Sequence, residues 1–323
     1  MLRRLLCVFA FALTLAPVAT ADGGGPAAGV NQGWDGVTAS GIGVRYVTVA
    51  TGTDTTLEMI RKRDGRVLNF MSLTGQWGIP AVANDGSTGG LSTDGRTLVL
   101  ADASPPIAGL RNQSSFLVVD TKNWRASQPV FLQGDFAFDA LSPNGSRLYL
   151  IQHVSASDST RYIVRAYDLS TGRLLPGRIA DRTQKGWVMQ GYPVSRATTA
   201  DGRWAYTLYR NNGGYPFIHA LNTVRGTAHC IGLPWHGSQQ YIFNVRLSLR
   251  DHARQLAVHW LNGTPIFAMD TKTYRLTRAT VARAGFDFPW WTLGIAGAVV
   301  LLGALVLRRG ALRRREAPEV LPT

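Results

Sequence analysis

The sequence has few of the residues from which catalytic and metal sites are commonly built. It contains two cysteines, Cys7 and Cys230, in 323 residues. Because Cys7 lies in an apolar N-terminal segment, we expect neither a disulfide framework nor a zinc site, and we expect Cys230 to be a small buried residue. Glu58 is the only glutamate between residues 22 and 288. This scarcity argues against acid–base chemistry by paired glutamates, whereas aspartate pairs stay open.

Clustered charge and catalytic motifs are also missing. The formal net charge is +14, but residues 5–307 hold 27 basic and 18 acidic residues, and the arginines are scattered singly. A nucleic-acid-binding protein would show a basic stripe or cluster, so no nucleic-acid partner is expected. The six histidines lack the spacing of a metal site, and no nucleophile elbow, phosphate loop or dinucleotide fingerprint occurs. No cofactor and no metal site are predicted.

The two ends of the chain have the composition of targeting segments. Residues 1–21 combine a charged start, an apolar run and a small-x-small ending, which is typical of a cleavable signal peptide. Residues 290–307 carry no charge and are followed by an arginine-rich flank, which predicts a transmembrane helix over 289–307. The chain is therefore predicted to be a single-pass cell-membrane protein. Its N-terminal domain is extracytoplasmic, residues 22–36 are a linker, and residues 308–323 are a basic cytoplasmic tail.

Between these ends a turn signal recurs. The clearest copy is LSPNGSRLYL at 141–150, where Asn144 and Gly145 indicate a hairpin because both tolerate a positive φ. Aligned on a Ser or Thr, the copies fall at Ser40, Ser92, Ser142, Thr199 and Ser248, with spacings of 52, 50, 57 and 49. A second mark, an apolar run that ends in Asp or Asn, follows each copy. It falls at Asp64, Asp120, Asp168, Asn222 and Asp270.

Two marks with the same period predict a repeated unit of four short strands, which is the blade of a β-propeller. The expected fold class is all-β. It is a β-propeller of about five four-stranded blades (a sixth, degenerate blade stays open), followed by the single C-terminal transmembrane helix. The propeller is expected over 37–285, with units near 37–77, 78–132, 133–184, 185–235 and 236–285.

Residues 142–150 (SPNGSRLYL) together with 167–172 (YDLSTG) resemble the repeat of the WD40-like and YVTN-type β-propellers of bacteria. The other copies match less well, and the Gly-His and Trp-Asp marks of eukaryotic WD40 repeats are absent. The resemblance implies an architecture. It does not select a function, because this broad group includes binding scaffolds, envelope proteins and some enzymes.

The connectors that lead from one unit to the next are long and carry aromatic and amide residues. In a propeller they emerge on one face around the central funnel, and exposed aromatics there suit recognition of protein, peptide or envelope glycan. The candidate binding residues are Gln76, Trp77, Phe136, Trp187, Tyr192, Trp235, His236 and Tyr241. The alternative is that these rings pack between the blades, which large side chains commonly do.

The missing catalytic constellation favours a membrane-anchored binding or scaffolding module at the bacterial cell surface. Two alternatives stay open. One is a propeller-type hydrolase or lactonase with an active site in the funnel, for which converging Asp and His side chains around an ion would be evidence. The other is a sensor that signals through the helix to a cytoplasmic partner, since the tail is too short for a domain. The sequence names neither the ligand nor the oligomeric state.

Overall fold

The computed structural model describes residues 30–31, 35–104, 109–184, 188–211 and 213–279. The regular structure of these residues is β-strand apart from two 3-10 helices, η1 (Arg182–Gln184) and η2 (Gln239–Asn244). No helix within the described ranges is both long and apolar enough to cross a membrane. The predicted signal peptide at 1–21, transmembrane helix at 289–307 and tail at 308–323 lie outside them.

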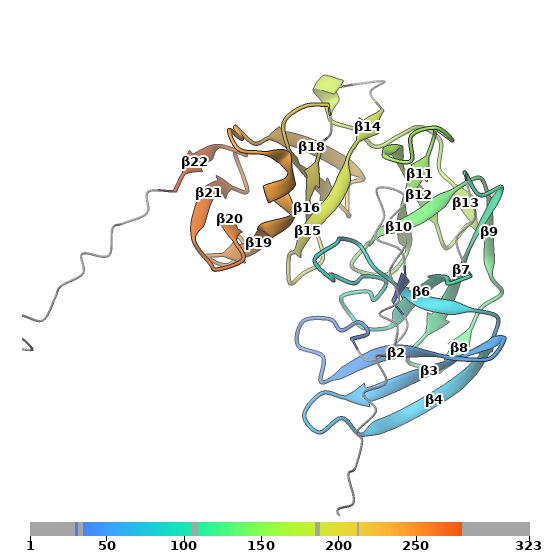
Figure 1. Cartoon of the computed structure of the whole chain (residues 1–323). Coiled ribbons are helices and arrows are strands. Elements are labelled where there is room, and N and C mark those ends of the chain that lie inside the picture. The colour runs from blue at the N-terminus through green and yellow to red at the C-terminus, as the bar shows by residue number, and fades with distance from the viewer. Residues whose placement is uncertain (1–29, 32–34, 105–108, 185–187, 212, 280–323) are drawn as a thin grey trace, which may run out of the picture. The chain divides into compact units, whose positions relative to one another are not determined.

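The strands form five antiparallel sheets, which we number in chain order (Figure 1). Sheet 1 contains β2 (Val44–Thr51), β3 (Asp54–Arg61) and β4 (Val67–Thr74). Sheet 2 contains β5 (Trp77–Pro80), β6 (Thr97–Asp102), β7 (Gln113–Asp120) and β8 (Arg125–Ala126), with β9 (Val130–Gln133) and β1 (Val30–Asn31) added. Sheet 3 contains β10 (Phe136–Leu141), β11 (Arg147–His153), β12 (Arg161–Asp168) and β13 (Arg173–Leu174), with β14 (Met189–Gln190) added.

Sheet 4 contains β15 (Tyr192–Thr198), β16 (Trp204–Arg210), β17 (Phe217–Asn222) and β18 (Thr227–Gly232). Sheet 5 contains β19 (Val245–Arg250), β20 (Gln255–Trp260), β21 (Pro265–Asp270) and β22 (Leu276–Arg278). In both sheets each strand pairs with the next one along the chain. Successive four-stranded meanders of this kind confirm the all-β, propeller-like architecture that the repeat predicts.

Sheet 1 departs from the four-strand pattern. The inner strand predicted near Ser40 is reduced to one bridge, between Val37 and Tyr46. One reason is that the Thr38 hydroxyl donates to the Val44 carbonyl (2.8 Å) and so takes a place that a main-chain ladder bond would fill. The predicted linker 22–36 differs too, because Val30–Asn31 inside it forms β1 and pairs with β5.

The repeated turn forms the predicted hairpin, but only Gly145 adopts a positive φ, whereas Asn144 acts through its side-chain oxygen. In sheet 3 the Ser142 hydroxyl accepts the Arg147 N–H (2.9 Å) and donates to the Asn144 amide oxygen (2.9 Å), while Gly145 adopts a φ of 71°. A Cβ on Gly145 would lie 2.4 Å from the Thr97 hydroxyl of sheet 2, so glycine also permits the close approach of two sheets. The hydroxyls of Ser92 and Thr199 accept the main-chain N–H of the residue five positions later in the same way.

The second turn is closed by a carboxylate or amide. Asp270 accepts the N–H groups of Lys272 (3.0 Å) and Thr273 (2.7 Å), and Asp120, Asp168 and Asn222 do the same in their sheets. In sheet 1 the equivalent residue is Arg61, whose carbonyl accepts the Gly65 N–H as the Asp270 carbonyl accepts that of residue 274. The mark predicted at Asp64 for the first unit is therefore wrong by three positions.

Apolar residues join successive sheets. Each sheet shares a buried apolar cluster with the next sheet along the chain. In order from sheets 1 and 2 to sheets 4 and 5, the clusters include Leu57 with Leu98, Val99 with Leu150, Tyr149 with Leu221, and Leu208 with Leu256. β3 and β12 alternate buried and more exposed residues, whereas β6, β11, β16 and β17 are buried at four or more successive positions because they lie between neighbours on both faces.

A loop of sheet 2 reaches sheet 4. The Asn84 N–H donates to the Pro193 carbonyl (3.0 Å), and the Asp85 carboxylate accepts the Arg196 N–H (3.2 Å) of β15. The Arg196 guanidinium in turn binds the carboxylate of Asp139 on β10 in a buried ion pair. Side chains and main chain of sheets 2, 3 and 4 thus meet where their inner strands converge.

Candidate functional site

The structure distributes the seven described residues of the eight predicted for the site over several sheets and does not bring these seven together. Trp77, Phe136 and Trp235 are buried, with 6%, 1% and 8% of their surface exposed. Gln76 and Tyr192 are half-buried, His236 and Tyr241 are exposed, and Trp187 lies outside the described residues. None of the described seven lines the groove presented below. A shared aromatic binding face is therefore not formed by Trp77, Phe136 and Trp235, whereas ligand contact by the exposed residues stays a prediction.

The burial of the two tryptophans has a local cause. The Trp77 indole N–H donates to the Thr74 carbonyl (2.9 Å), and that of Trp235 donates to the Ser238 carbonyl (3.2 Å). Because each indole N–H already has a main-chain acceptor nearby in the chain, each ring can fill the space between two sheets at little cost in free energy. Trp235 also meets Trp260 of sheet 5 edge to face, with ring centroids 5.6 Å apart. The alternative interpretation of these connectors, packing between blades, is correct for these rings.

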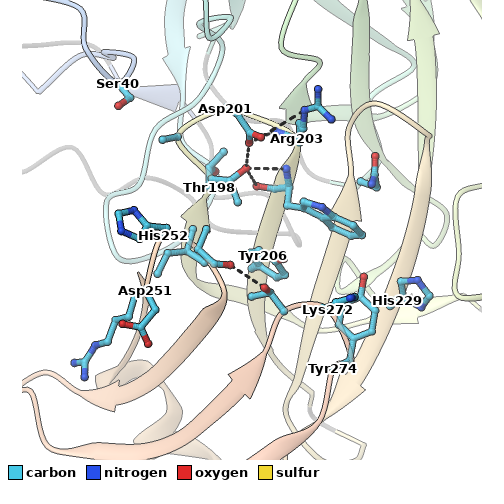
Figure 2. A pocket seen from close by; sticks show the side chains of 18 of the residues that line it. Ser40, Thr198, Asp201, Arg203, Tyr206, His229, Asp251, His252, Lys272 and Tyr274 are labelled. Carbon is cyan, nitrogen blue, oxygen red and sulfur yellow. Dashed lines mark hydrogen bonds and ion pairs between the residues drawn. The ribbon is translucent and has the colours of Figure 1, made fainter.

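A different feature stands out, a groove where sheets 4 and 5 meet, with a volume of about 1120 Å³ (Figure 2). We call it the sheet 4–5 groove. Its walls come from the turns that precede β16 and β20, from the turn between β17 and β18 with the start of β18, and from the turn between β21 and β22. In Figure 2, Asp251 and His252 lie on one side, and Tyr274 and His229 lie on the other.

Aromatic rings line the sheet 4–5 groove. Trp204 stacks on Tyr206 with centroids 6.0 Å apart, and Tyr274 meets Trp204 edge to face at 6.2 Å. On its other side Tyr274 packs against His229, at 4.5 Å between ring centroids. Burial raises the pKa of both tyrosine hydroxyls, so both remain protonated donors at neutral pH.

The His229 ring is held from outside the groove. Its Nδ1 lies 3.8 Å from the carboxylate of Asp181. Burial favours the neutral form of that carboxylate, but hydrogen bonds from Thr183 and the Cys230 N–H and the nearby His229 outweigh it, so the pKa of Asp181 is lowered. An ionised Asp181 therefore lies beside the imidazole that Tyr274 packs against.

Positive charge surrounds the aromatic rings. The groove is lined by four cationic side chains, Arg203, Arg225, Arg250 and Lys272, and by two carboxylates, Asp201 and Asp251. Arg203 lies 3.5 Å from Asp201, and both are exposed. Among the described residues, the other three cations form no salt bridge. The groove therefore offers cations to a ligand in excess of its own carboxylates.

Strained backbone is concentrated at the same place. Within the described part of the chain, five non-glycine residues have a positive φ, and four of them, Asp251, His252, Ala253 and Tyr274, line the groove. A left-handed conformation costs an L-residue roughly 1–2 kcal/mol, and such residues gather at functional sites when the surrounding fold enforces them. The concentration of this strain at one groove marks it as the strongest candidate site of the described chain.

The two strained turns differ from most copies of the repeat. At the position of Tyr274 (φ 58°), sheets 1, 3 and 4 have Gly65, Gly172 and Gly226, whereas sheet 2 has Trp124, which is also left-handed (φ 54°). At the position where sheets 2, 3 and 4 have Ser92, Ser142 and Thr199, sheet 5 has Arg250, which pairs with Gln255. The mark predicted at Ser248 is thus two positions early. Aligning LRDHARQ on its turn would have shown from sequence that an arginine replaces the hydroxyl and that the turn glycine is missing.

A cysteine and a histidine in sheet 4 lie close together but are not poised for nucleophilic chemistry. Cys230 Sγ is 3.6 Å from His219 Nδ1. Burial raises the pKa of the thiol to about 12 and lowers that of the imidazole to about 4. Both groups are therefore neutral at pH 7, and a thiolate, the reactive form, is not favoured. No group of three or more His, Cys, Asp or Glu side chains that could hold a metal occurs within the described ranges.

A second polar cluster joins sheets 2 and 3. Arg111 Nε donates to Asp135 Oδ1 (2.8 Å), and His153 Nδ1 lies 3.1 Å from Asp135 Oδ2. Burial alone would raise the pKa of Asp135, but the two partners lower it below the usual range. Arg111 also donates to the Phe136 carbonyl (2.6 Å), so the cluster fixes the start of β10.

Comparisons with known proteins describe the fold only. No known family model matches the chain, and no curated protein matches it in sequence. Solved structures that resemble it include the Dos1 propeller (10% identity, 76% of this chain and 58% of that one, TM-score 0.44). Others are the Cps50 (Swd1) β-propeller domain of Myceliophteria thermophila (12%, 81% and 68%, 0.40) and the hydrazine synthase of Kuenenia stuttgartiensis (14%, 71% and 74%, 0.39). With all three TM-scores below 0.5, we base no functional conclusion on them.

Proposed function

We propose that this protein is a membrane-anchored, extracytoplasmic β-propeller of five blades that binds a ligand in the sheet 4–5 groove at the bacterial cell surface. The observation that carries the proposal is the concentration of four left-handed non-glycine residues at a groove lined with aromatic rings and cations. Strained residues cluster at active sites, ligand clamps and switch regions. Binding suits the groove because its aromatic rings offer apolar contact and its cations offer charged hydrogen bonds.

The proposed location is supported by the two ends of the sequence. The signal-like residues 1–21 and the uncharged run 290–307 with its arginine flank favour an extracytoplasmic domain and a cytoplasmic tail. A topology assay tests this. Intact cells that express the full chain with a C-terminal epitope are treated with an external protease. We expect loss of the folded domain and survival of a short tagged fragment. A fully protected chain would refute the proposed topology.

Hydroxyl-radical footprinting tests ligand binding even while the ligand is unidentified. The full-length chain in detergent micelles is oxidised with and without a mixture of peptides and glycan fragments released from the host envelope. We expect Trp204 and Tyr274 to be protected, while the exposed Tyr215 of sheet 4, which does not line the groove, reacts equally in both samples. Protection of Tyr241 and His236 without protection of the groove would move the site to the connector before β19. Unchanged reactivity throughout would refute a binding role for the groove.

A further inference from the structure

The aromatic part of the sheet 4–5 groove suits a ring with an apolar face. The rings of Trp204, Tyr274 and His229 follow one another along the groove, with successive centroids 6.2 Å and 4.5 Å apart. Flat aromatic surfaces of this size bind planar groups and the C–H faces of sugars, because both offer contact area with few polar atoms. The Tyr274 hydroxyl has no hydrogen bond among the described residues and can serve the polar edge of such a ring.

Some threonine hydroxyls that line the groove already form hydrogen bonds within the protein, and others do not. Thr199 and Thr271 already close the turns of sheets 4 and 5, where they bind Asp201 (2.6 Å) and the Ala253 carbonyl (2.7 Å). By contrast, Thr198 and Thr227 line the groove without a side-chain hydrogen bond inside the described part of the chain. Hydroxyls donate and accept equally well, so they match a ligand that is itself rich in hydroxyl groups.

The charge of the groove narrows the chemical class of ligand that the groove can bind. Arg225, Arg250 and Lys272 extend from three different turns or strands of two sheets. Guanidinium groups bind carboxylates and phosphates through paired N–H donors, and such charge-assisted bonds are stronger than neutral ones. Of the two lining carboxylates in the described chain, Asp251 is the one that forms no salt bridge with a cation. A ligand that presents anions beside hydroxylated rings satisfies the aromatic, hydroxyl and cationic features together.

We infer, on the basis of the proposed function, that the ligand of the sheet 4–5 groove is an anionic saccharide, a chain of sugar rings that carry carboxylate or phosphate groups (Figure 2). The rings of Trp204 and Tyr274 hold the sugars, and the three cations bind the acidic groups. Arg250 stands where sheets 2, 3 and 4 have Ser or Thr, and Tyr274 stands where sheets 1, 3 and 4 have Gly, and these two residues contribute one group of each kind.

Binding is measured by isothermal titration of the full-length chain in detergent micelles with three probes of equal length. These are an oligogalacturonate for the carboxylate, a phosphomannan oligosaccharide for the phosphate, and a neutral maltooligosaccharide. We expect at least one anionic probe to bind ten-fold or more tightly than the neutral one, with affinity that falls as salt rises. The probe that binds identifies the acidic group. Equal binding of the neutral probe, or no binding of either anionic probe, overturns the inference.

Two substitutions at the groove provide the matched test. Arg250→Gln removes one cation, and we expect at least a five-fold loss of affinity for the anionic probe, while the exposed Arg173→Gln on β13 leaves it unchanged. Tyr274→Gly installs the residue that sheets 1, 3 and 4 use, so it relieves strain while it removes the ring. We expect a folded variant that has lost affinity for every probe. Full affinity in both groove variants overturns the inference.

The footprint, repeated with the peptides, the neutral glycans and the anionic glycans of the envelope as separate fractions, distinguishes a failure of this inference from a failure of the proposed function. If Trp204 and Tyr274 are protected by a neutral glycan or by a peptide, the groove binds a ligand but the ligand class is wrong. If no fragment of the envelope protects them, the groove has no binding role and both proposals fail.

Discussion

At the scale of single residues, His219 is a buried titratable group that does not line the sheet 4–5 groove. It is 1% exposed on β17, and its ring lies edge-on to Tyr209 with centroids 6.5 Å apart. Burial is the main cause that lowers its pKa to about 4, and the nearby Arg196 adds to the effect although Asp139 opposes it. The fold therefore holds this imidazole neutral, whereas the unfolded chain protonates it near its ordinary pKa of about 6.5.

We predict that His219 makes the protein sensitive to mild acid. Between pH 6.5 and 4 the unfolded chain binds a proton that the folded chain does not, so the free energy of unfolding falls as pH falls through this window. The loss amounts to roughly 3 kcal/mol. Urea unfolding at pH 7 and pH 4.5 should show most of this loss in the parent and a smaller loss in His219→Gln. The exposed His236→Gln should behave as the parent. An unchanged acid loss in His219→Gln would contradict the prediction.

Residue types alone could not separate the rings that pack from the rings that line the groove. Trp77 and Trp235 fall where the sequence predicts exposed connectors, but each satisfies its indole with a carbonyl three residues away and becomes part of the core. Tyr274 looks ordinary in sequence. Its importance comes from a φ of 58° and from a neighbour, His229, that is far away along the chain. A local bond satisfies each indole, but contacts with the neighbouring sheet bury the ring, and residue type alone does not show those contacts.

At the scale of elements, β4 differs from the other outer strands. It runs for eight residues, and Val67, Leu68 and Phe70 on it are exposed. A long apolar edge invites pairing with another chain, and proteins usually blunt such edges. In β4 two side chains cap the main-chain groups of one residue. The Phe70 N–H donates to the Asn69 side chain (2.9 Å), and the Trp124 indole donates to the Phe70 carbonyl (3.0 Å).

We predict that removing both caps promotes self-association. In the double variant Asn69→Ala, Trp124→Phe the main-chain groups of Phe70 lose their side-chain partners, while position 124 keeps an aromatic ring. Sedimentation velocity of the full-length chain in micelles should show a concentration-dependent oligomer that the parent lacks at the same concentration. Adding Phe70→Lys, which places a charge on the edge, should reverse it. A double variant that sediments like the parent would count against this role of the two caps.

The turns are the elements that sequence predicts best. The Pro143-Asn144-Gly145 signal specifies its hairpin through local bonds and a positive φ, so its structure follows from its own residues. The Asp marks of sheets 2, 3 and 5 work for the same reason. Where the local chemistry changes, the prediction fails: Arg61 and Arg250 occupy turn positions without the expected oxygen, and the repeat pattern predicts the marks at Asp64 and Ser248 instead. The sheet 4–5 groove lies at one of these exceptions.

At the scale of the whole molecule, repeats predict the sheets but not the polar bonds that join one sheet to another. The Asp139–Arg196 pair links β10 to β15, and the 81–90 loop of sheet 2 adds Asp85 to the same point. Asp139 lies at a β-bulge, where the register shifts between Phe138 and Ala140. A bulge re-aims a side chain, so a residue that simple alternation assigns to one face can serve another.

We predict that substitutions of Asp139 and Arg196 have strongly non-additive effects on the free energy of unfolding. Side chains of Arg196 and Asp139 are only 6% and 2% exposed, so Arg196→Met leaves a buried carboxylate without its cation and should lower the free energy of unfolding by about 3–5 kcal/mol. Replacing both, as Asp139→Leu with Arg196→Met, removes the uncompensated charge and should cost far less than the sum of the single variants. Urea unfolding of the parent and the three variants gives the coupling energy. For comparison, Arg63→Met breaks an exposed pair with Asp64 and should cost less than about 1 kcal/mol. Additive losses at Asp139 and Arg196 would show instead that each side chain stabilises the junction of sheets 2, 3 and 4 independently.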